Sequence, residues 1–339
     1  MSENTNTTKR RSAIQIMGSL IGLVKPLLHI MLAAIILGTL GYLCAIFLTI
    51  LAGQVIMHGL LTGVAGMIVP VDNMWRVFTP VKTIITVMIV IAVLRGILHY
   101  VEQYCNHFIA FKLLAIIRHK VFAALRKLCP AKLEGRDKGN LISIITTDIE
   151  LLEVFYAHTI SPIAIATLTS IIMVIFIGRY HWLAGVIALV AYLIVGVVIP
   201  MWNGKRGSQK GMEFRTNFGE LNSFVLDSLR GLDETIQYGQ GEKRKEQMSE
   251  HSKNLAGMQE SLSKMEGSQR SFTNMVILLA SFGMLALTIW LYDKGAMGFE
   301  GILTCTIAMM GSFGPVVALS SLSNNLNQTL ASGEPVSYT

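Results

Sequence analysis

Long apolar runs with few charged residues constrain this chain more than any other feature. Residues 27 to 57 contain no Asp, Glu, Lys or Arg, and about 20 apolar residues are enough for a helix to cross a bilayer. Six such runs predict spanning helices at about 27–57, 81–110, 154–178, 182–202, 271–292 and 301–330. Only 14% of the residues are charged, against about a quarter in soluble domains. The sequence therefore predicts an all-α, multi-pass membrane protein.

Helical spacing of apolar residues continues beyond the second span and between the fourth and fifth spans. After the second span it is carried by Phe111, Leu114, Ile117, Phe122 and Leu125. A helix from near Lys82 to near Leu128 would be roughly 70 Å long, more than twice the hydrocarbon thickness of about 30 Å. Residues 203–270 continue this spacing and predict a pair of long helices in water. We therefore expect two long helical extensions outside the bilayer.

The distribution of positive charge predicts the orientation of the helices. Of the 28 Lys and Arg residues, 23 lie before the first span, in residues 112–138 or in residues 205–270. Basic residues concentrate on the cytoplasmic side of membrane proteins. Both termini and both long extensions are therefore predicted to be cytoplasmic, in a bacterial plasma membrane. The net charge of +7 does not indicate nucleic-acid binding, because aromatic residues are not interleaved with the basic ones.

The N-terminal residues predict a short approach to the membrane. Residues 1–11 are polar and basic and are expected to be disordered. Residues 12–25 place apolar side chains on one helical face, which is typical of an elbow helix lying along the interface.

Two sequence elements carry a resemblance to a known family. Gly139-Asn140-Leu141-Ile142-Ser143, followed by Thr147-Asp148-Ile149-Glu150, is similar to the "GDLLSRLTxDV" element of ABC exporter membrane domains, with Asn140 replacing the common acid and Ile144 the common Arg. Within that family, one run resembles the thiol-reductant branch, which exports cysteine and glutathione and supports cytochrome bd assembly. That run is Arg95, Tyr100, Glu102, His107, Phe111, Arg118, Phe122, Leu125 and Pro130.

The resemblance implies a fold, a mechanism and partners. It implies the six-helix type IV exporter fold as a domain-swapped homo- or heterodimer, in which residues 334–339 begin a linker toward a nucleotide-binding domain. It also implies coupling helices at about residues 131–140 and 239–247 that dock on such domains. The coupling candidates are Leu133, Glu134, Arg136, Asp137, Gln240, Glu242, Lys243 and Arg244.

The sequence contains no nucleotide-binding motif. Neither a GxxxxGK[ST] phosphate loop nor an LSGGQ-like signature occurs, so we expect no catalytic residue and no cofactor in this chain. ATP and Mg²⁺ would bind a nucleotide-binding domain outside this sequence, either fused to it or on a separate polypeptide.

One polar stripe lies within the apolar part of the chain. Arg95, His99, Glu102 and Asn106 are spaced three or four residues apart and so share a helical face. Two readings stay open: a wall that attracts a zwitterionic or carboxylate-bearing substrate, or an ion pair that fixes helix packing. Further candidates for a substrate cavity are Gln103, Asn274, Thr304 and Met309.

Met309 also precedes Gly311, Gly314 and Pro315, which predict an interruption of the sixth helix. His29, His58, His99 and His107 leave haem binding open as an alternative, whereas the four scattered cysteines predict neither a disulfide nor a metal site. The function that we expect is ATP-driven export of a small solute. The resemblance to the thiol-reductant branch implies cysteine and glutathione as its substrates. The alternatives are an exporter of peptides, lipids or drugs, and a non-transporting haem-binding or assembly-scaffold subunit.

Overall fold

The computed structural model describes residues 27–63, 81–128 and 160–319, and every regular element in these ranges is a helix. The helices are α2 (Leu28–Gly63), α3 (Val81–Leu128), α6 (Ser161–Gly178), α7 (Trp182–Leu193), the π-helix η5 (Ile194–Val198), α8 (Ile199–Arg230), α9 (Leu232–Gln237), α10 (Gly241–Asp293) and α11 (Phe299–Gly311). Six stretches are long and apolar enough to cross a membrane: Leu28–Met57, Lys82–Lys127, Ser161–Gly178, Trp182–Asn203, Gly241–Asp293 and Phe299–Leu319. The predicted all-α fold with six spans is confirmed.

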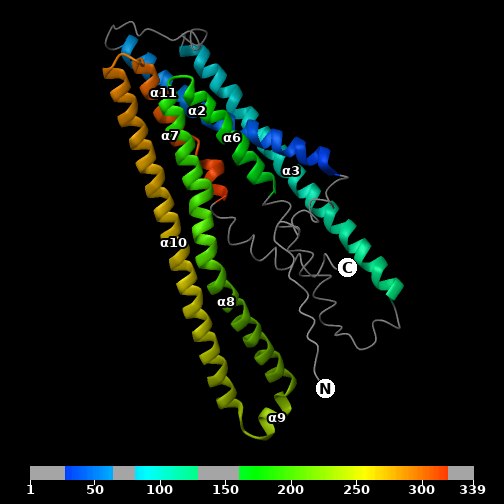
Figure 1. Cartoon of the computed structure of the whole chain (residues 1–339). Helices are drawn as coiled ribbons and strands as arrows, with labels where there is room; N and C mark the ends of the chain where they lie inside the picture. Colours follow the sequence, from blue (N-terminus) through cyan, green and yellow to red (C-terminus); the bar gives the residue numbers. More distant parts are fainter. Residues whose placement is uncertain (1–26, 64–80, 129–159, 320–339) are drawn as a thin grey trace, which may run out of the picture.

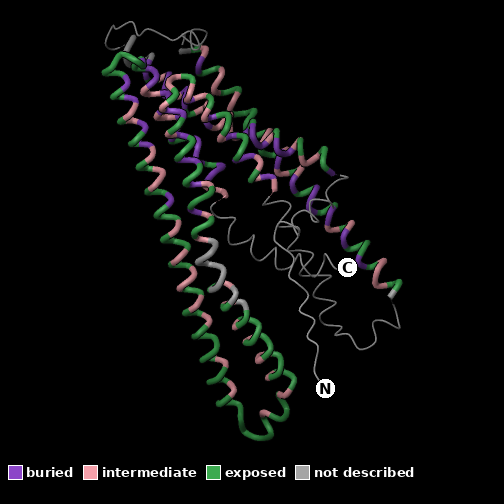
Figure 2. Tube along the Cα trace, in the orientation of Figure 1, coloured by how far each residue is buried: buried purple, intermediate pink, exposed green. Residues whose placement is uncertain are grey.

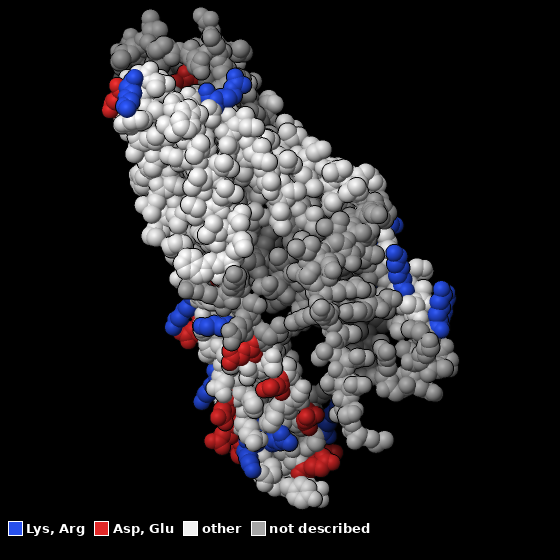
Figure 3. Space-filling model, in the orientation of Figure 1, with Lys and Arg blue, Asp and Glu red and all other residues white. Residues whose placement is uncertain are grey.

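The surface divides into a broad uncharged band and charged ends. In Figure 3, Lys, Arg, Asp and Glu lie along the long hairpin and at the opposite end, and Lys and Arg also lie at the end of α3, while the described body between them is free of charge on the face shown. Such a band matches the hydrocarbon core of a bilayer, in which exposed charge is costly. The chain is thus a multi-pass membrane protein.

Two long arms extend from the membrane bundle. In one arm, α7, η5 and α8 follow one another from Trp182 to Arg230, and α10 packs beside them. The other arm is α3, a single helix of 48 residues that confirms the continuous helix expected from Lys82 to Leu128. Figure 1 shows the two arms diverging away from the bundle.

The core lies at the membrane end of the molecule, where α2, α6, α7, α10 and α11 meet (Figure 2). The largest fully buried side chains are Ile46, Ile50, Ile84, Leu113, Met173, Ile177, Met284 and Met309. Along the hairpin most residues are exposed or half-buried. The hairpin is therefore held mainly by packing between its own two helices.

Short turns connect the spans at the predicted places. Residues 179–181 separate α6 from α7, and Nδ1 of His181 accepts a hydrogen bond of 3.2 Å from the backbone N–H of Leu183. This bond satisfies one of the N–H groups left open at a helix start. Gly295 follows α10 with a φ of +70°, a left-handed conformation that favours glycine.

Several boundaries differ from the expected ones. α2 continues to Gly63 because its apolar helical character extends past the predicted end at residue 57. The fifth span is the C-terminal part of one 53-residue helix, α10, rather than a separate element. The predicted elbow helix (12–25), the N-terminus (1–11), residues 154–159 and 320–330 of two spans and the linker (334–339) lie outside the described residues.

The α6–α7 turn depends on a close approach of two glycines, which gives a first prediction. A methyl group placed on Gly185 would lie 2.9 Å from Cα of Gly178 and 3.3 Å from the carbonyl oxygen of Val174. Backbone atoms cannot rotate away, so Gly185→Ala should destabilise the protein by about 1–3 kcal/mol. Thermal unfolding in detergent measures the effect.

Gly283→Ala is the matched control for this substitution. A methyl group there meets no atom within 4 Å, and alanine favours helix over glycine. We expect no loss of unfolding temperature. Equal effects of the two substitutions would contradict the proposed contact between α6 and α7.

Candidate functional site

The sixth span is broken within the bundle by a two-residue turn. α11 ends at Gly311, Ser312 and Phe313 form the turn, and helix resumes at Gly314. Pro315 has no backbone N–H to donate to the preceding turn, which accounts for the break. The hydroxyl of Ser312 donates 3.1 Å to the carbonyl oxygen of Met309. The predicted interruption near Gly311 to Pro315 is therefore confirmed.

Side chains from α7 and α2 pack on the two sides of this break. The hydroxyl groups of Tyr192 and Ser312 are hydrogen-bonded, and the Tyr192 ring meets Phe313 edge to face with centroids 5.3 Å apart. On the other side, a methyl group on Gly311 would lie 2.9 Å from Oγ1 of Thr49, and one on Gly314 would lie 3.6 Å from the ring of Tyr42. The two glycines thus permit close approach of α2.

Two of the predicted cavity residues lie on the packed side of α11. Thr304 and Met309 are both fully buried. Oγ1 of Thr304 accepts a hydrogen bond of 2.9 Å from Nε2 of Gln54 on α2, and Oε1 of Gln54 is buried without a hydrogen-bond partner among the described residues. In this conformation both predicted residues serve helix packing, and neither is exposed to a ligand.

The polar stripe on α3 divides into a buried part and an exposed part. Glu102 and Asn106 are buried, and Nδ2 of Asn106 donates to Oε1 of Glu102 at 2.6 Å. Nδ1 of His99 lies 3.3 Å from Oε2 of the same carboxylate, and the side chain of Gln103 also hydrogen-bonds it. His99 itself is exposed, as is Arg95.

Glu102 reaches the bundle because α2 carries a glycine opposite it. A methyl group on Gly38 would lie 2.4 Å from Cδ1 of Ile165 and 3.1 Å from Cγ of Glu102. Gly38 thus lets α3 and α6 approach α2 at the same level. The carboxylate at this junction accepts several hydrogen bonds, which is the condition for burying a charge. Glu102 therefore acts mainly as a packing residue.

Arg95 is an exposed cation of the stripe and, unlike His99, is not paired with Glu102 in an ion pair that the structure records. Arg95 lies on α3, which packs along α2, the helix that carries Tyr42. Tyr42 also contacts Gly314 after the break in α11, as described above. α2 therefore lies against both α3, which carries Arg95, and the broken sixth span.

Asn274 is the predicted cavity residue that the structure does not bring to this site. It is exposed on α10, whereas its neighbour Thr273 is buried and donates 2.9 Å to the carbonyl oxygen of Gln269. Contacts between described elements bring α10 beside α7, α8 and α11. Asn274 thus lies on the outer side of α10 in a single copy of the chain.

The tip of the long hairpin differs from the predicted coupling helix. A separate short helix, α9, occupies Leu232–Gln237 and is followed by a turn at Gly239, whose φ is +64°. Gln240 caps α10, and Glu242, Lys243 and Arg244 form its first turn. The Arg244 guanidinium lies 4.9 Å from the ring centroid of Phe224 and so braces the hairpin. Leu133, Glu134, Arg136 and Asp137 lie outside the described residues.

Apolar side chains are exposed on α9 and at its C-cap, at the end of the hairpin predicted to lie in water. Ile236 and Tyr238 are 69% and 73% exposed, and Leu232 is 50% exposed. Apolar groups gathered at the end of a charged hairpin are typical of a protein contact surface. We call Leu232, Ile236 and Tyr238 the apolar tip.

The described histidines do not gather into a ligand set. No group of three or more His, Cys, Asp or Glu suited to a metal ion occurs among the described residues. His99 pairs with Glu102, and the ring of His107 stacks on Phe111 with centroids 6.2 Å apart. The structure thus offers no specific support for the haem alternative.

Three residues of this region escaped the sequence prediction, namely Tyr42, Tyr192 and Gln54. Gln54 carried a usable signal, because it is the only amide or acid between residues 27 and 57. The two tyrosines carried none, since a tyrosine within a span is as common in packing as at a site. Their positions follow from how three helices meet at the α11 break.

Comparisons with known proteins agree with this architecture. Residues 27–316 match the family described as the ABC transporter transmembrane region. A "Probable ABC transporter ATP-binding/permease protein" of Haemophilus influenzae is 41% identical over 330 residues, which cover 96% of this chain and 57% of that protein. The chain therefore spans little more than half the length of that relative.

More distant relatives carry different printed activities. The "Glutathione/L-cysteine transport system ATP-binding/permease protein CydC" of Haemophilus influenzae is 20% identical over 73% of this chain and 43% of that protein. An "ATP-dependent lipid A-core flippase" of Escherichia coli K12 is 25% identical over 70% of this chain and 40% of that protein. The family match over most of the chain, the six spans and the long hairpin show that this chain belongs to the ABC transporter transmembrane region family.

Proposed function

We propose that this chain is the membrane domain of an ATP-driven exporter that works as a pair of such domains. The observation that carries the proposal is the pair of long arms, which extend from the uncharged band on the side predicted to be cytoplasmic. ABC membrane domains typically pair with nucleotide-binding domains. The apolar tip on α9 is suited to contact such a domain.

The proposed mechanism is alternating access driven from the arms. ATP binding would draw two nucleotide-binding domains together, and the arms would transmit this movement to the spans. The divergence of the α8–α10 hairpin from α3 (Figure 1) supports a swapped arrangement, in which the hairpin packs on the partner membrane domain. Substrate then shifts the conformational equilibrium only through different affinities for the inward and outward states.

For the substrate we propose a small zwitterionic thiol of the cysteine or glutathione type. Arg95 supplies an exposed cation for a carboxylate. The carboxylate of Glu102 is already occupied by Asn106, His99 and Gln103, so recognition by the stripe rests on Arg95. The printed name of the CydC relative agrees with this substrate class.

A test of the proposed substrate uses inverted vesicles containing the complete transporter. ATP should drive accumulation of radiolabelled cysteine or glutathione. Arg95→Ala should reduce this uptake about ten- to a hundredfold, because a charge-assisted hydrogen bond contributes about 1.5–3 kcal/mol, while basal ATP hydrolysis stays unchanged. Arg95→Lys should retain part of the uptake.

Arg179→Ala provides a control, because Arg179 lies in the turn between α6 and α7 and not on α3. Its uptake should equal that of the unmodified protein. Accumulation of a peptide but of neither thiol would refute the proposed substrate. Loss of assembly in Arg95→Ala would instead assign Arg95 to packing.

A second candidate function is lipid export, which one observation favours. A groove of about 260 Å³ runs between α6 and the α7–η5 segment, with Val316 and Leu319 after the α11 break at its floor. Most of its lining is apolar, as a site for an acyl chain requires. ATP-dependent movement of a fluorescent lipid between leaflets, without thiol uptake, would support this function over the first.

A further inference from the structure

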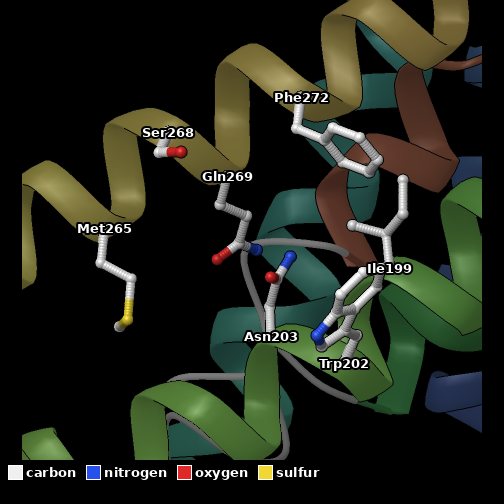
Figure 4. A pocket seen from close by; sticks show the side chains of 7 residues that line it. All are labelled: Ile199, Trp202, Asn203, Met265, Ser268, Gln269 and Phe272. Carbon is white, nitrogen blue, oxygen red and sulfur yellow. The ribbon is translucent and has the colours of Figure 1, made fainter.

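We propose that a cleft between α8 and α10 binds a neutral ligand that carries an amide group. The cleft has a volume of about 270 Å³ and lies where the hairpin leaves the fourth and fifth spans. Figure 4 shows it between the two helices, with Asn203 and Trp202 on one wall and Gln269 and Phe272 on the other.

The local backbone explains why the two helices separate there. The π-helix η5 ends at Val198, and Pro200 stands in the first turn of α8. A π-helical turn changes the direction in which the following residues point, and proline removes a backbone hydrogen bond. Further along the hairpin, Nζ of Lys210 donates 3.2 Å to Oγ of Ser261 and joins the helices again. The cleft is thus a local opening between two regions of contact.

Two carboxamides define the chemistry of the cleft. In Figure 4 the amides of Asn203 and Gln269 extend toward each other from opposite helices. Each carboxamide offers two donor hydrogens and one acceptor oxygen. A secondary amide presents one donor and one acceptor in a plane, so both of its groups can be bonded by this pair. Ser268 adds a hydroxyl at the same wall.

The rest of the lining selects against formal charge and for an apolar body. None of the residues that line the cleft carries a charge at neutral pH. Trp202 and Phe272 supply aromatic surface, and Met265 supplies a flexible side chain that adapts to ligands of varied shape. The volume of about 270 Å³ is slightly below the range of about 300–1,000 Å³ for small-molecule sites, so the ligand must be small. A blocked amino acid or short neutral peptide fits this chemistry.

This cleft lies between α8 and α10, whereas Arg95 lies on α3. Its proposed ligand is neutral, whereas the ligand proposed for Arg95 carries a carboxylate. Binding in the cleft requires neither ATP nor movement across the membrane, so the inference does not depend on the proposed export of thiols. If the protein exports a peptide-like solute, the cleft is a place where such a solute is bound near the inner boundary of the membrane.

Equilibrium binding of tritiated N-acetyl-L-leucinamide to the full-length protein in lipid nanodiscs, without nucleotide, tests the inference. Unlabelled N-acetyl-L-leucinamide should compete. Free leucine, which is zwitterionic, and isoamyl acetate, a neutral ester with a similar branched chain, should compete at least tenfold less well. Asn203→Leu and Gln269→Leu should each weaken binding about five- to tenfold, because each removes hydrogen bonds to the ligand.

Asn217→Leu is the matched control. Asn217 is half-buried on α8 outside the cleft, and its amide donates 2.9 Å to the carbonyl oxygen of Glu213. Its binding should equal that of the unmodified protein. Gln269→Asn keeps the amide and should retain more binding than Gln269→Leu, which separates ligand contact from loss of folding. Equal competition by the ester, or unchanged binding in both leucine variants, would overturn the proposal.

Discussion

Replacing Ile236 with aspartate should abolish most ATP-driven transport while leaving membrane insertion intact. Ile236 is 69% exposed on α9, at the end of the hairpin most distant from the bundle. A buried charge in a protein contact costs several kcal/mol when it is unpaired, so docking of a nucleotide-binding domain at the apolar tip should fail. Transport should fall at least a hundredfold, and substrate should no longer stimulate ATP hydrolysis. Vesicle uptake and ATPase assays on the complete transporter measure both.

Phe218→Asp is the control for this variant. Phe218 is also exposed on the hairpin, at 47%, but it precedes Leu232 by 14 residues, about 21 Å along a helix. Its uptake should remain well above that of Ile236→Asp. The sequence favoured Glu242, Lys243 and Arg244 as the contact instead. If Lys243→Glu uncouples the transporter and Ile236→Asp does not, the contact surface is the first turn of α10.

Glu102→Ala should produce the largest loss of stability among the substitutions discussed. Its removal deprives the buried Asn106 amide of its 2.6 Å bond, and Oδ1 of Asn106 already has no hydrogen-bond partner among the described residues. An unsatisfied buried polar group costs about 1–3 kcal/mol, and the space left beside Gly38 and Ile165 adds to that cost. We expect about 3 kcal/mol in total, measured as a lower temperature of thermal unfolding in nanodiscs.

Two further variants separate packing from substrate recognition at Glu102. Glu102→Gln keeps both the volume and an oxygen acceptor, so it should restore most of the stability. Arg95→Ala should change the unfolding temperature little, because Arg95 is exposed. If Glu102→Gln unfolds normally but transports nothing, the carboxylate charge contacts substrate and the packing role is wrong.

The general fold was predictable because its physical signals are long and redundant. Each span needs about 20 apolar residues, and a few boundary errors, as at Gly63, do not alter the number of spans. The break in α11 was also predictable, because Gly311, Gly314 and Pro315 are local causes of a local effect. The turn at residues 179–181 was also predictable, because three residues between two spans are too few to form another helix or strand.

The roles of individual polar residues were less predictable, because they depend on which helices meet. Spacing alone placed Arg95 and Glu102 on one face, yet one is exposed and the other is buried opposite Gly38. Thr304 was expected at a cavity but packs against Gln54, which is 250 positions away in sequence. At the hairpin tip, the family resemblance implied a coupling helix at about residues 239–247, whereas the separate short helix is formed by the preceding residues 232–237.

The unbroken length of α10 has a mechanical consequence. It comprises 53 residues, about 80 Å at 1.5 Å per residue. Arg270 marks the transition from its polar to its apolar part, which leaves about 45 Å on one side and about 35 Å on the other. A rigid tilt of about 5° around that point would move the α9 end by about 4 Å and the far end by about 3 Å in the opposite direction. Such a helix is a nearly balanced lever, which reverses the direction of a displacement and preserves most of its size.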